Sequence, residues 1–184
     1  MDESQIMNTE KFVIRELRYE EYEDASRLMW LTYYKFESKG KTMEQIESFR
    51  DSIEAVSLSM NSFDGRMMLL GAFDKSGNLA GTCGIKLKTY PDDMKDFVNE
   101  NDHITLLFTD GEYHKKGIGR RLLQEMISTA EKRALLHSET VFITVNSSDF
   151  AVGFYEKNGF TKTGERTVTK DSVYTPMRYN ANKE

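Results

Sequence analysis

The chain has 184 residues, of which 39% are hydrophobic and 30% are charged. This length fits one domain that is large enough to bury a sizeable core. No apolar run approaches the length of a membrane span, and the acidic start at residues 1–5 lacks the apolar segment of a secretory signal. A cytoplasmic protein without membrane contact is therefore expected.

The charge and the cysteine content exclude further classes of protein. A net charge of −5 argues against broad nucleic-acid binding, because phosphate backbones are bound by a clustered basic face. The acidic excess suits a cationic acceptor, or it only keeps the surface soluble. Cys83 is the single cysteine, which excludes an intrachain disulfide and a cysteine-based metal site. His103, His114 and His137 lack ligand spacing, so no metal is expected.

The first half of the chain combines strand and helix patterns. Residues 12–17 have the alternation and β-branching of a strand, and apolar residues recur at helical spacing in residues 19–37 and 43–60. The connection between these helices, residues 38–42, is free to shape a ligand site. A strand, a turn and a second strand follow at residues 66–73, 74–78 and 79–87.

The second half contains the longest helical pattern. A polar connection at residues 90–102 leads into a short apolar strand at 104–109. One apolar stripe then runs along residues 118–136 and predicts a helix that packs across a sheet. A strand, a short helix and a closing pair of strands follow at residues 140–146, 149–157, 160–168 and 172–179.

The order of these elements defines the expected fold class. The order β-α-α-β-β-β-α-β-α-β-β predicts one α/β domain with a mixed sheet of about seven strands and about four helices. We place this domain at residues 12–180, between a flexible tail at 1–11 and a short tail at 181–184. No internal repeat or linker divides the sequence.

Residues 103–136 form a strand, a glycine-containing loop and a helix start, a combination that suits an anion. The first turn of a helix has unpaired N–H groups and roughly half a positive charge, so phosphate oxygens bind there. Gly117 and Gly119 lack a Cβ and let the main chain approach a ligand closely. The cationic or potentially cationic side chains around them are His114, Lys115, Lys116, Arg120 and Arg121. We interpret the loop as a pyrophosphate-binding site.

Other interpretations of this loop explain less. A P-loop requires Gly-Lys-Ser/Thr and a dinucleotide-binding loop requires a third glycine, and neither occurs here at the required spacing. The loop also follows the fourth predicted strand rather than the first. A purely structural domain does not explain why glycines and cations concentrate at one helix start.

Two motifs resemble those of the GNAT superfamily of N-acetyltransferases. Residues 107–123, Leu-Phe-Thr-Asp-Gly-Glu-Tyr-His-Lys-Lys-Gly-Ile-Gly-Arg-Arg-Leu-Leu, are similar to its acetyl-CoA motif. Residues 146–160, Asn-Ser-Ser-Asp-Phe-Ala-Val-Gly-Phe-Tyr-Glu-Lys-Asn-Gly-Phe, are similar to its second motif. The resemblance covers nearly the whole chain and implies a twisted, mostly antiparallel sheet and acetyl-CoA-dependent acetyl transfer to a primary amine. A non-catalytic sensor that binds acyl-CoA is the alternative.

The resemblance also implies a set of cofactor-binding residues. The main chain of the glycine loop and the helix start would hold the CoA pyrophosphate, and the strand before it would pair with the pantetheine arm. The residues implied are Leu107, Phe108, Thr109, His114, Lys115, Lys116, Gly117, Ile118, Gly119, Arg120, Arg121, Asn146, Phe154 and Tyr155. The family usually has Arg or Gln at the position of His114, and a neutral imidazole supplies less charge.

Acetyl transfer also needs a proton acceptor for the amine, a donor for the leaving thiolate and stabilisation of the oxyanion. The resemblance points to Tyr155 as the acid, because a phenol with a pKa of about 10 stays protonated; its alternative role is packing under the helix. His103 stands where some family members carry a catalytic Glu, and it is the candidate base or else a surface residue. A backbone N–H near Phe108 is the expected oxyanion donor.

The amine acceptor, a small molecule or a peptide, is expected to approach past residues 38–42 and 90–102. Tyr33, Tyr34 and Tyr90 are the predicted substrate-binding residues. The acids expected beside them are Asp92, Asp93 and Asp96, although such acids are usually a solvated face. The C-terminal strands are candidates for pairing between two chains in a homodimer.

Overall fold

The computed structural model describes residues 12–93 and 95–181, and eight strands in these residues form one mixed sheet. The strands are β1 (Val13–Glu16), β2 (Met68–Phe73), β3 (Leu79–Lys86), β4 (Asp102–Thr109), β5 (Ile143–Ser147), β6 (Phe160–Lys162), β7 (Thr167–Val168) and β8 (Val173–Tyr179). Their order is β1-β2-β3-β4-β5-β8-β6, and β7 also pairs with β8. Within the described residues only β4 and β5 pair in parallel. The predicted mixed, mostly antiparallel sheet is confirmed.

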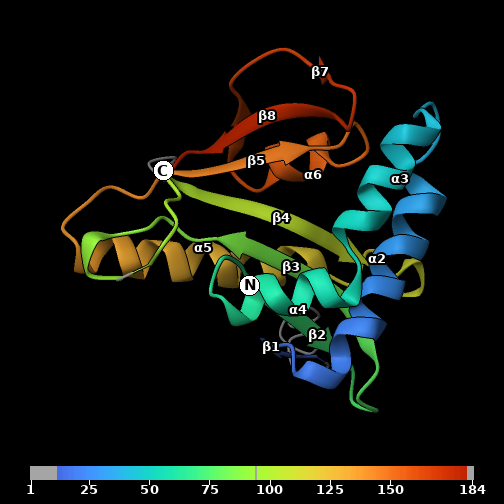
Figure 1. Cartoon of the computed structure of the whole chain (residues 1–184), viewed down its shortest axis with the longest axis horizontal. Helices are drawn as coiled ribbons and strands as arrows, with labels where there is room; N and C mark the ends of the chain where they lie inside the picture. Colours follow the sequence, from blue (N-terminus) through green and yellow to red (C-terminus); the bar gives the residue numbers. More distant parts are fainter. Residues whose placement is uncertain (1–11, 94, 182–184) are drawn as a thin grey trace, which may run out of the picture.

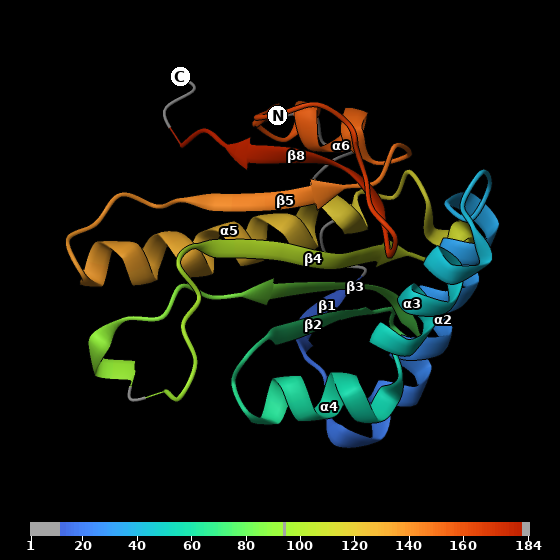
Figure 2. The same cartoon turned by 45° about the horizontal axis from the view of Figure 1, so that its top comes forward.

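Helices cover both faces of this sheet. They are α2 (Tyr22–Phe36), α3 (Met43–Ser52), α4 (Ala55–Phe63), α5 (Ile118–Leu136) and α6 (Val152–Lys157), with the 3-10 turns η1 (Tyr19–Glu21), η2 (Pro91–Asp93) and η3 (Gly111–Tyr113). Figure 1 shows α5 behind the strands and α2, α3 and α4 in front of them. Figure 2 shows the C-terminal end of α2 and the start of α5 at the same end of the sheet.

Each face of the sheet has its own hydrophobic core. The stripe predicted on the long helix is confirmed, because Leu122, Met126 and Ala130 of α5 are fully buried against the strands. On the opposite face, Ala25 and Met29 of α2 are fully buried. The sheet therefore separates a face covered by α5 and α6 from a face covered by α2, α3 and α4.

The helix predicted at residues 43–60 is two helices, which raises the number from about four to five. α3 ends at Ser52 and α4 begins at Ala55, because Glu54 between them has extended backbone (φ −54°, ψ 137°). Ile53 is 1% exposed and fills the core beneath α2. The apolar spacing continues through this break, so periodicity alone does not reveal it.

The strand predicted at residues 160–168 is also divided, into β6 and β7, which both pair with β8. The β7–β8 turn reaches across to α3, where Gln45 Nε2 donates to the Thr169 carbonyl oxygen (2.8 Å). Lys170 Nζ lies 2.8 Å from Glu44 Oε1 in the same contact. The tail proposed at residues 1–11, and all but residue 181 of the second tail, lie outside the described residues.

The close contact of β3 with β4 and α5 gives a test of this packing. A Cβ at Gly81 would lie 2.9 Å from the Phe108 carbonyl oxygen and 3.2 Å from Ile118 Cγ2. We expect Gly81→Ala to destabilise the fold by about 1–3 kcal/mol, because overpacking displaces neighbours. Denaturant unfolding measures the change.

The matched control is Gly153→Ala in α6, where an added Cβ meets nothing within 4 Å. This change should be neutral or stabilise by up to about 1 kcal/mol, because Ala favours helix more than Gly does. Equal stability of the Gly81→Ala variant and the unchanged protein would contradict the close approach.

Candidate functional site

The parallel strands β4 and β5 separate along their length. Their ladder joins residues 102–104 to residues 143–145, and the described residues form no further pair between these strands. Both strands nevertheless continue, β4 to Thr109 and β5 to Ser147. These two strand ends, residues 105–109 and 146–147, do not pair with each other, and we call the space between them the strand opening.

The main chain of β4 directs hydrogen-bonding groups to the strand opening. The Asp110 N–H donates to the Ala80 carbonyl oxygen (3.0 Å), and Phe108, two residues earlier, faces β3 in the same way. Residues of an antiparallel pair alternately direct their main-chain groups toward the partner and away from it. Leu107 and Thr109 therefore direct their N–H and C=O groups away from β3 and into the opening.

The start of α5 adds main-chain donors at the same end of the sheet. The Arg121 N–H donates to the Gly117 carbonyl oxygen (3.1 Å). The N–H groups of residues 118–120 precede this bond and so have no carbonyl partner within the helix. Gly117 has a left-handed conformation (φ 80°), and a Cβ there would meet nothing within 4 Å. The helix dipole and the open surface together favour an anion.

Two of the cationic or potentially cationic side chains around the loop make hydrogen bonds to main-chain carbonyl groups of the protein. His114 Nε2–H donates to the Thr109 carbonyl oxygen (2.9 Å), and the His114 ring lies 4.9 Å from the ring of Phe36. Arg121 Nη1 donates to the Phe12 carbonyl oxygen (3.4 Å), on the side of β1. The exposed members of the set are Lys115, Lys116 and Arg120.

A groove of about 450 Å³ lies between α5, the end of α6 and the end of β8. Arg120 and Gln124 line it from α5, and Lys157 lines it from α6. Gly119 lies close to α6, because a Cβ there would be 3.6 Å from the Phe154 ring. Gln124 and Lys157 are not predictable as part of the site, since spacing along the sequence does not show that α6 ends beside α5.

Tyr155 of α6 is 4% exposed and lies in the core beneath α5. Its ring makes edge contacts with Phe154 and Phe160, at centroid distances of 5.4 and 5.3 Å. Burial raises the pKa of the Tyr155 phenol well above 10, and Cys83 and Glu37 act in the same direction. The phenol therefore keeps its proton at neutral pH, which is the state that an acid requires.

His103 lies in the paired part of β4, before the strand opening. Its Nδ1 is 2.8 Å from Thr144 Oγ1, which accepts from Asn101 Nδ2 (2.6 Å) and donates to the Asp102 carbonyl oxygen (3.3 Å). Because the hydroxyl proton is used there, Nδ1–H donates to Thr144 and Nε2 is left as an acceptor. Burial lowers the pKa of His103, and Lys86 lowers it further.

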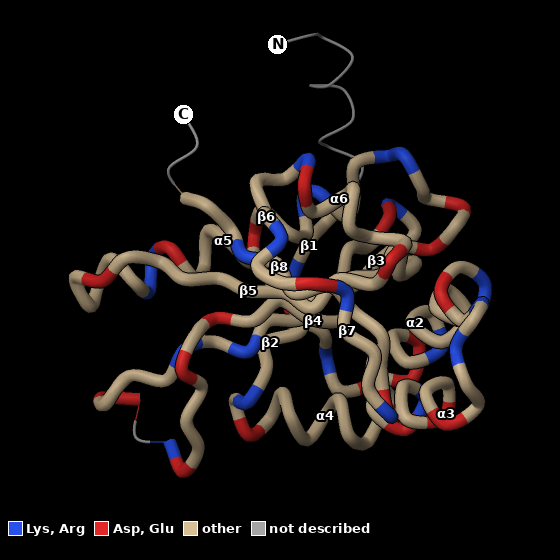
Figure 3. The backbone as a smooth tube through the Cα atoms, turned by 90° about the horizontal axis from the view of Figure 1, so that it is seen from above, with Lys and Arg blue, Asp and Glu red and all other residues tan. Residues whose placement is uncertain are grey.

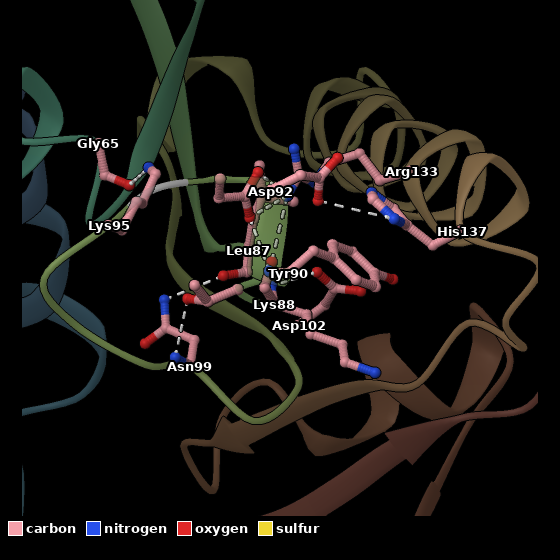
Figure 4. Close-up of polar contacts among 12 residues, drawn as sticks. Gly65, Leu87, Lys88, Tyr90, Asp92, Lys95, Asn99, Asp102, Arg133 and His137 are labelled. Carbon is pink, nitrogen blue, oxygen red and sulfur yellow. Dashed lines mark hydrogen bonds and ion pairs between the residues drawn. The ribbon is translucent and has the colours of Figure 1, made fainter.

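The three tyrosines expected around the acceptor do not lie together. Tyr33 is 2% exposed and stacks on Phe49 at 3.8 Å, whereas Tyr34 is exposed on the outside of α2. Tyr90 is 5% exposed and stacks at 3.6 Å on His137, at the end of α5 (Figure 4). The structure therefore does not bring Tyr90 to the face of the sheet that holds Tyr33.

The acids of the 90–102 connection also make local contacts. Arg133 Nη2 of α5 lies 2.9 Å from Asp93 Oδ2, and Asp102 Oδ1 accepts from the Lys88 N–H (2.8 Å). Asp96 Oδ1 lies 3.8 Å from Arg66 Nη2. Figure 4 shows Tyr90 and Asp92 directed toward Arg133 and His137 of α5. Asp93 therefore fastens the start of the connection to α5, whereas Asp96 contacts the segment between α4 and β2.

A different group of side chains meets beside the strand opening on the α2 side. Glu37 at the end of α2 lies next to Ser148, which follows β5, and interacts electrostatically with Lys41. Asp149 is held by Arg166, whose Nε lies 2.9 Å from Asp149 Oδ1. The 38–42 connection is predictable from the sequence as a segment that shapes a ligand site, whereas no local pattern singles out Glu37.

Three further features of the described residues concern metal ligands, membrane-spanning helices and the distribution of charge. They contain no group of three His, Cys, Asp or Glu side chains that could hold a metal ion. In residues 12–93 and 95–181, no helix is both long enough and apolar enough to cross a membrane. Basic and acidic residues occur together over the helices and loops (Figure 3).

Comparison with known families agrees with this arrangement. Residues 37–181 match the profile of the acetyltransferase (GNAT) domain family. The match spans most of the chain, including both unpaired strand ends, α5 and α6. The chain therefore belongs to the GNAT acetyltransferase family.

Solved structures of other acetyltransferases share the fold. The PaiA N-acetyltransferase of Thermoplasma acidophilum, crystallised with coenzyme A, is 23% identical over 91% of this chain and 98% of its own, with a TM-score of 0.68. A GCN5-related N-acetyltransferase of Rhodopseudomonas palustris is 17% identical over 92% and 95%, with a TM-score of 0.69. A predicted acetyltransferase of Clostridium acetobutylicum, solved with acetyl-CoA, is 13% identical over 86% and 95%, with a TM-score of 0.63.

The loop before α5 is tied to the β2–β3 turn through one hydrogen bond. Tyr113 Oη in η3 donates to Asp74 Oδ2 (2.7 Å), and Asp74 Oδ1 accepts from the N–H groups of Ser76 and Asn78. These bonds lower the pKa of Asp74 to about 2, and the Tyr113 bond is the largest cause. A lowered pKa stabilises the fold above the ordinary pKa of Asp, and this contribution is lost as the pH falls toward 2.

We expect Tyr113→Phe to raise the pKa of Asp74 toward its ordinary value, because the phenol bond is lost. The variant should also exchange the amide protons of residues 110–117 faster. Carboxyl NMR titration and hydrogen exchange measure the two effects. The control is Tyr19→Phe, which alters an exposed phenol outside this contact; an Asp74 titration unchanged by Tyr113→Phe would contradict the link.

Proposed function

We propose that this protein transfers an acetyl group from acetyl-CoA to a primary amine. The observation that carries the proposal is the alignment of main-chain groups that face away from β3 or out of the helix start, from the N–H groups of residues 118–120 to the Thr109 and Leu107 groups in the strand opening. Leu107 packs against the same core that holds Tyr155. Membership of the acetyltransferase family supports the reaction class.

Each part of acetyl-CoA has a proposed contact in this alignment. The diphosphate binds the N–H groups at the start of α5, because unpaired donors and the helix dipole favour an anion there. The phosphorylated ribose lies toward the groove lined by Arg120 and Lys157. The pantetheine arm pairs with Leu107 and Thr109 of β4, opposite the exposed Asn146 of β5. The Thr109 carbonyl oxygen accepts a hydrogen bond from His114. Binding of the pantetheine arm replaces this bond with a hydrogen bond from the ligand.

The chemical steps follow from the groups at the end of this arm. The Leu107 N–H points into the opening and is our candidate for the oxyanion donor, whereas the Phe108 N–H faces β3. Tyr155 donates its proton to the departing sulfur. The base predicted from the sequence is His103, whose neutral ring has a free Nε2. Because His103 precedes the opening, a base role for it requires a bridging water.

A catalytic enzyme and a non-catalytic sensor of acyl-CoA give different results in one assay. The enzyme binds acetyl-CoA and releases CoA thiol when an acceptor amine is added, whereas the sensor binds it and releases no thiol above background. Spermidine, an amino sugar and a lysine-containing peptide sample three classes of amine. Calorimetry with acetyl-CoA and a thiol-release assay with these amines test the proposal.

We expect Gly117→Glu to abolish acetyl-CoA binding in calorimetry. The added carboxylate would project into the open space before α5 and repel the diphosphate. Gly77→Glu is the matched control, because Gly77 has nearly the same left-handed conformation (φ 84°) and equally open surroundings, in the β2–β3 turn. Both variants should unfold at similar temperatures. Undiminished binding by Gly117→Glu would remove the diphosphate assignment.

We expect Tyr155→Phe to keep acetyl-CoA affinity but to lower kcat by about a hundredfold or more, since general acid catalysis contributes that much. Steady-state kinetics on the most active of the three amines measure the loss. Tyr22→Phe is the control, because Tyr22 is a buried tyrosine in the core on the other face of the sheet. Normal turnover by Tyr155→Phe would show that the acid is another group.

A further inference from the structure

A partly buried carboxyl group, Glu37, lies beside the strand opening, and no step described above uses it. Glu37 follows the last turn of α2, where its N–H donates to the Tyr33 carbonyl oxygen (2.8 Å). The end of α2 lies at the opening, because the ring of the preceding Phe36 is 4.9 Å from the His114 ring before α5 and 5.5 Å from the Phe150 ring after β5. The Glu37 carboxyl group interacts with Ser148 after β5 and with Tyr155 of α6. Three elements from distant parts of the chain therefore meet at this one carboxyl group.

The surroundings of Glu37 have the chemistry of an amine-binding site. Lys41 supplies a primary ammonium group that interacts with Glu37 and Asp149. Its Nζ lies 4.5 Å from the centre of the Tyr33 ring, a cation–π contact. An alkylammonium group thus already lies against an aromatic face at this place and interacts electrostatically with two carboxylates. An acceptor ammonium has the same chemistry as the Lys41 side chain.

The inner side of the cluster faces the proposed reaction. The Ser148 hydroxyl is buried and makes no hydrogen bond of regular geometry in the described part of the chain, although it lies close enough to Glu37 to lower the pKa of that carboxyl. Glu37 contributes to the raised pKa of Tyr155, and Cys83 is the other ionisable group that does so. Glu37 therefore interacts both with the Lys41 ammonium group and with the proposed acid.

We propose that Glu37 is the general base that takes a proton from the acceptor amine, an inference that rests on the acetyl transfer proposed above. The ammonium loses one proton to the Glu37 carboxylate, and the freed lone pair forms the N–C bond with the thioester carbonyl. The C–S bond then breaks, and Tyr155 gives its proton to the sulfur. The second proton of the nitrogen returns to the Tyr155 phenolate. Glu37 releases the first proton to solvent, so one proton leaves overall.

The ionisation of the neighbouring groups fits this assignment. Burial raises the pKa of Glu37, while Lys41 and Ser148 oppose that rise. A raised pKa makes the carboxylate a stronger base, and the rate falls as the pH drops through it because Glu37 becomes protonated. Burial raises the pKa of Tyr33 to about 12, and the pKa of Tyr155 is also raised, so both phenols keep their protons. Arg166 lowers the pKa of Asp149, which stays ionised.

His103 is less well placed for the same task. Acid and base must serve one carbonyl carbon, and His103 still pairs with β5, at Thr144, before the opening begins. Its hydrogen-bonded neighbour is Thr144, in the paired part of the sheet. The fall of the rate at low pH is the acid limb of the pH profile. The two candidates predict that this limb is lost in different variants.

The experiment measures pH profiles of kcat and kcat/KM for Glu37→Gln with the most active of spermidine, the amino sugar and the lysine peptide. We expect kcat to fall about a hundredfold or more near pH 7, with the Kd for acetyl-CoA unchanged. The loss should shrink at alkaline pH, where the amine arrives without its proton. Gln should not unfold the protein, because burial already disfavours the charged form of Glu37.

Two matched variants and one titration complete the test. Glu47→Gln changes an exposed carboxyl of α3 and should have a normal profile. His103→Gln should retain the acid limb. Carboxyl NMR of the unchanged protein, with the Glu37 signal assigned by its loss in Glu37→Gln, should give a pKa above the ordinary value for Glu.

The possible outcomes separate this inference from the proposed function. If the unchanged protein releases no thiol with any of the three amines, the acetyl transfer fails and the inference fails with it. If the unchanged protein is active and Glu37→Gln is equally active, or only its KM for the amine rises, Glu37 is not the base. Loss of the acid limb in His103→Gln alone would assign the proton to His103 instead.

Discussion

The separation of β4 from β5 is the constraint on which the rest of the site depends. A parallel ladder normally satisfies the main-chain groups of both strands, and a buried group without a partner is costly. Here the ladder stops after residues 102–104, while β4 continues for five more residues with its free edge exposed to the opening. Leu106 has a left-handed conformation at this point (φ 51°), and Thr82 Oγ1 donates to its carbonyl oxygen (3.1 Å). The divergence is therefore built into β4, and it leaves an edge that an extended ligand can pair with.

The elements around this opening come from both ends of the sequence. The β7–β8 turn docks on α3 through Gln45, which is 4% exposed and also belongs to the capping box at Thr42. α2 ends beside the loop after β5, and Phe36 lies between His114 and Phe150, at centroid distances of 4.9 and 5.5 Å. The donors that suit an acyl carrier and the carboxyl group that suits an amine thus meet only in the folded chain.

Local pattern predicted those parts of the molecule whose cause is local. The stripe along α5, the turn at residues 74–78 and the glycine loop each depend on neighbouring residues, and the structure contains all three. The break at Ile53 follows from packing under α2, and Tyr90 reaches α5 through stacking on His137. Glu37 is a candidate because it lies next to Ser148, which is more than a hundred positions later in the sequence. Spacing along the chain carries no information about such contacts.

The burial of Cys83 has a consequence for any chemistry that produces a free thiol. Cys83 is 0% exposed, and burial raises the pKa of its thiol, so it remains protonated and unreactive. Because it is the single cysteine of the chain, the folded protein offers no thiol that would compete with an amine in the proposed transfer. Under the proposed reaction, thiol reagents will therefore report the coenzyme thiol rather than the polypeptide.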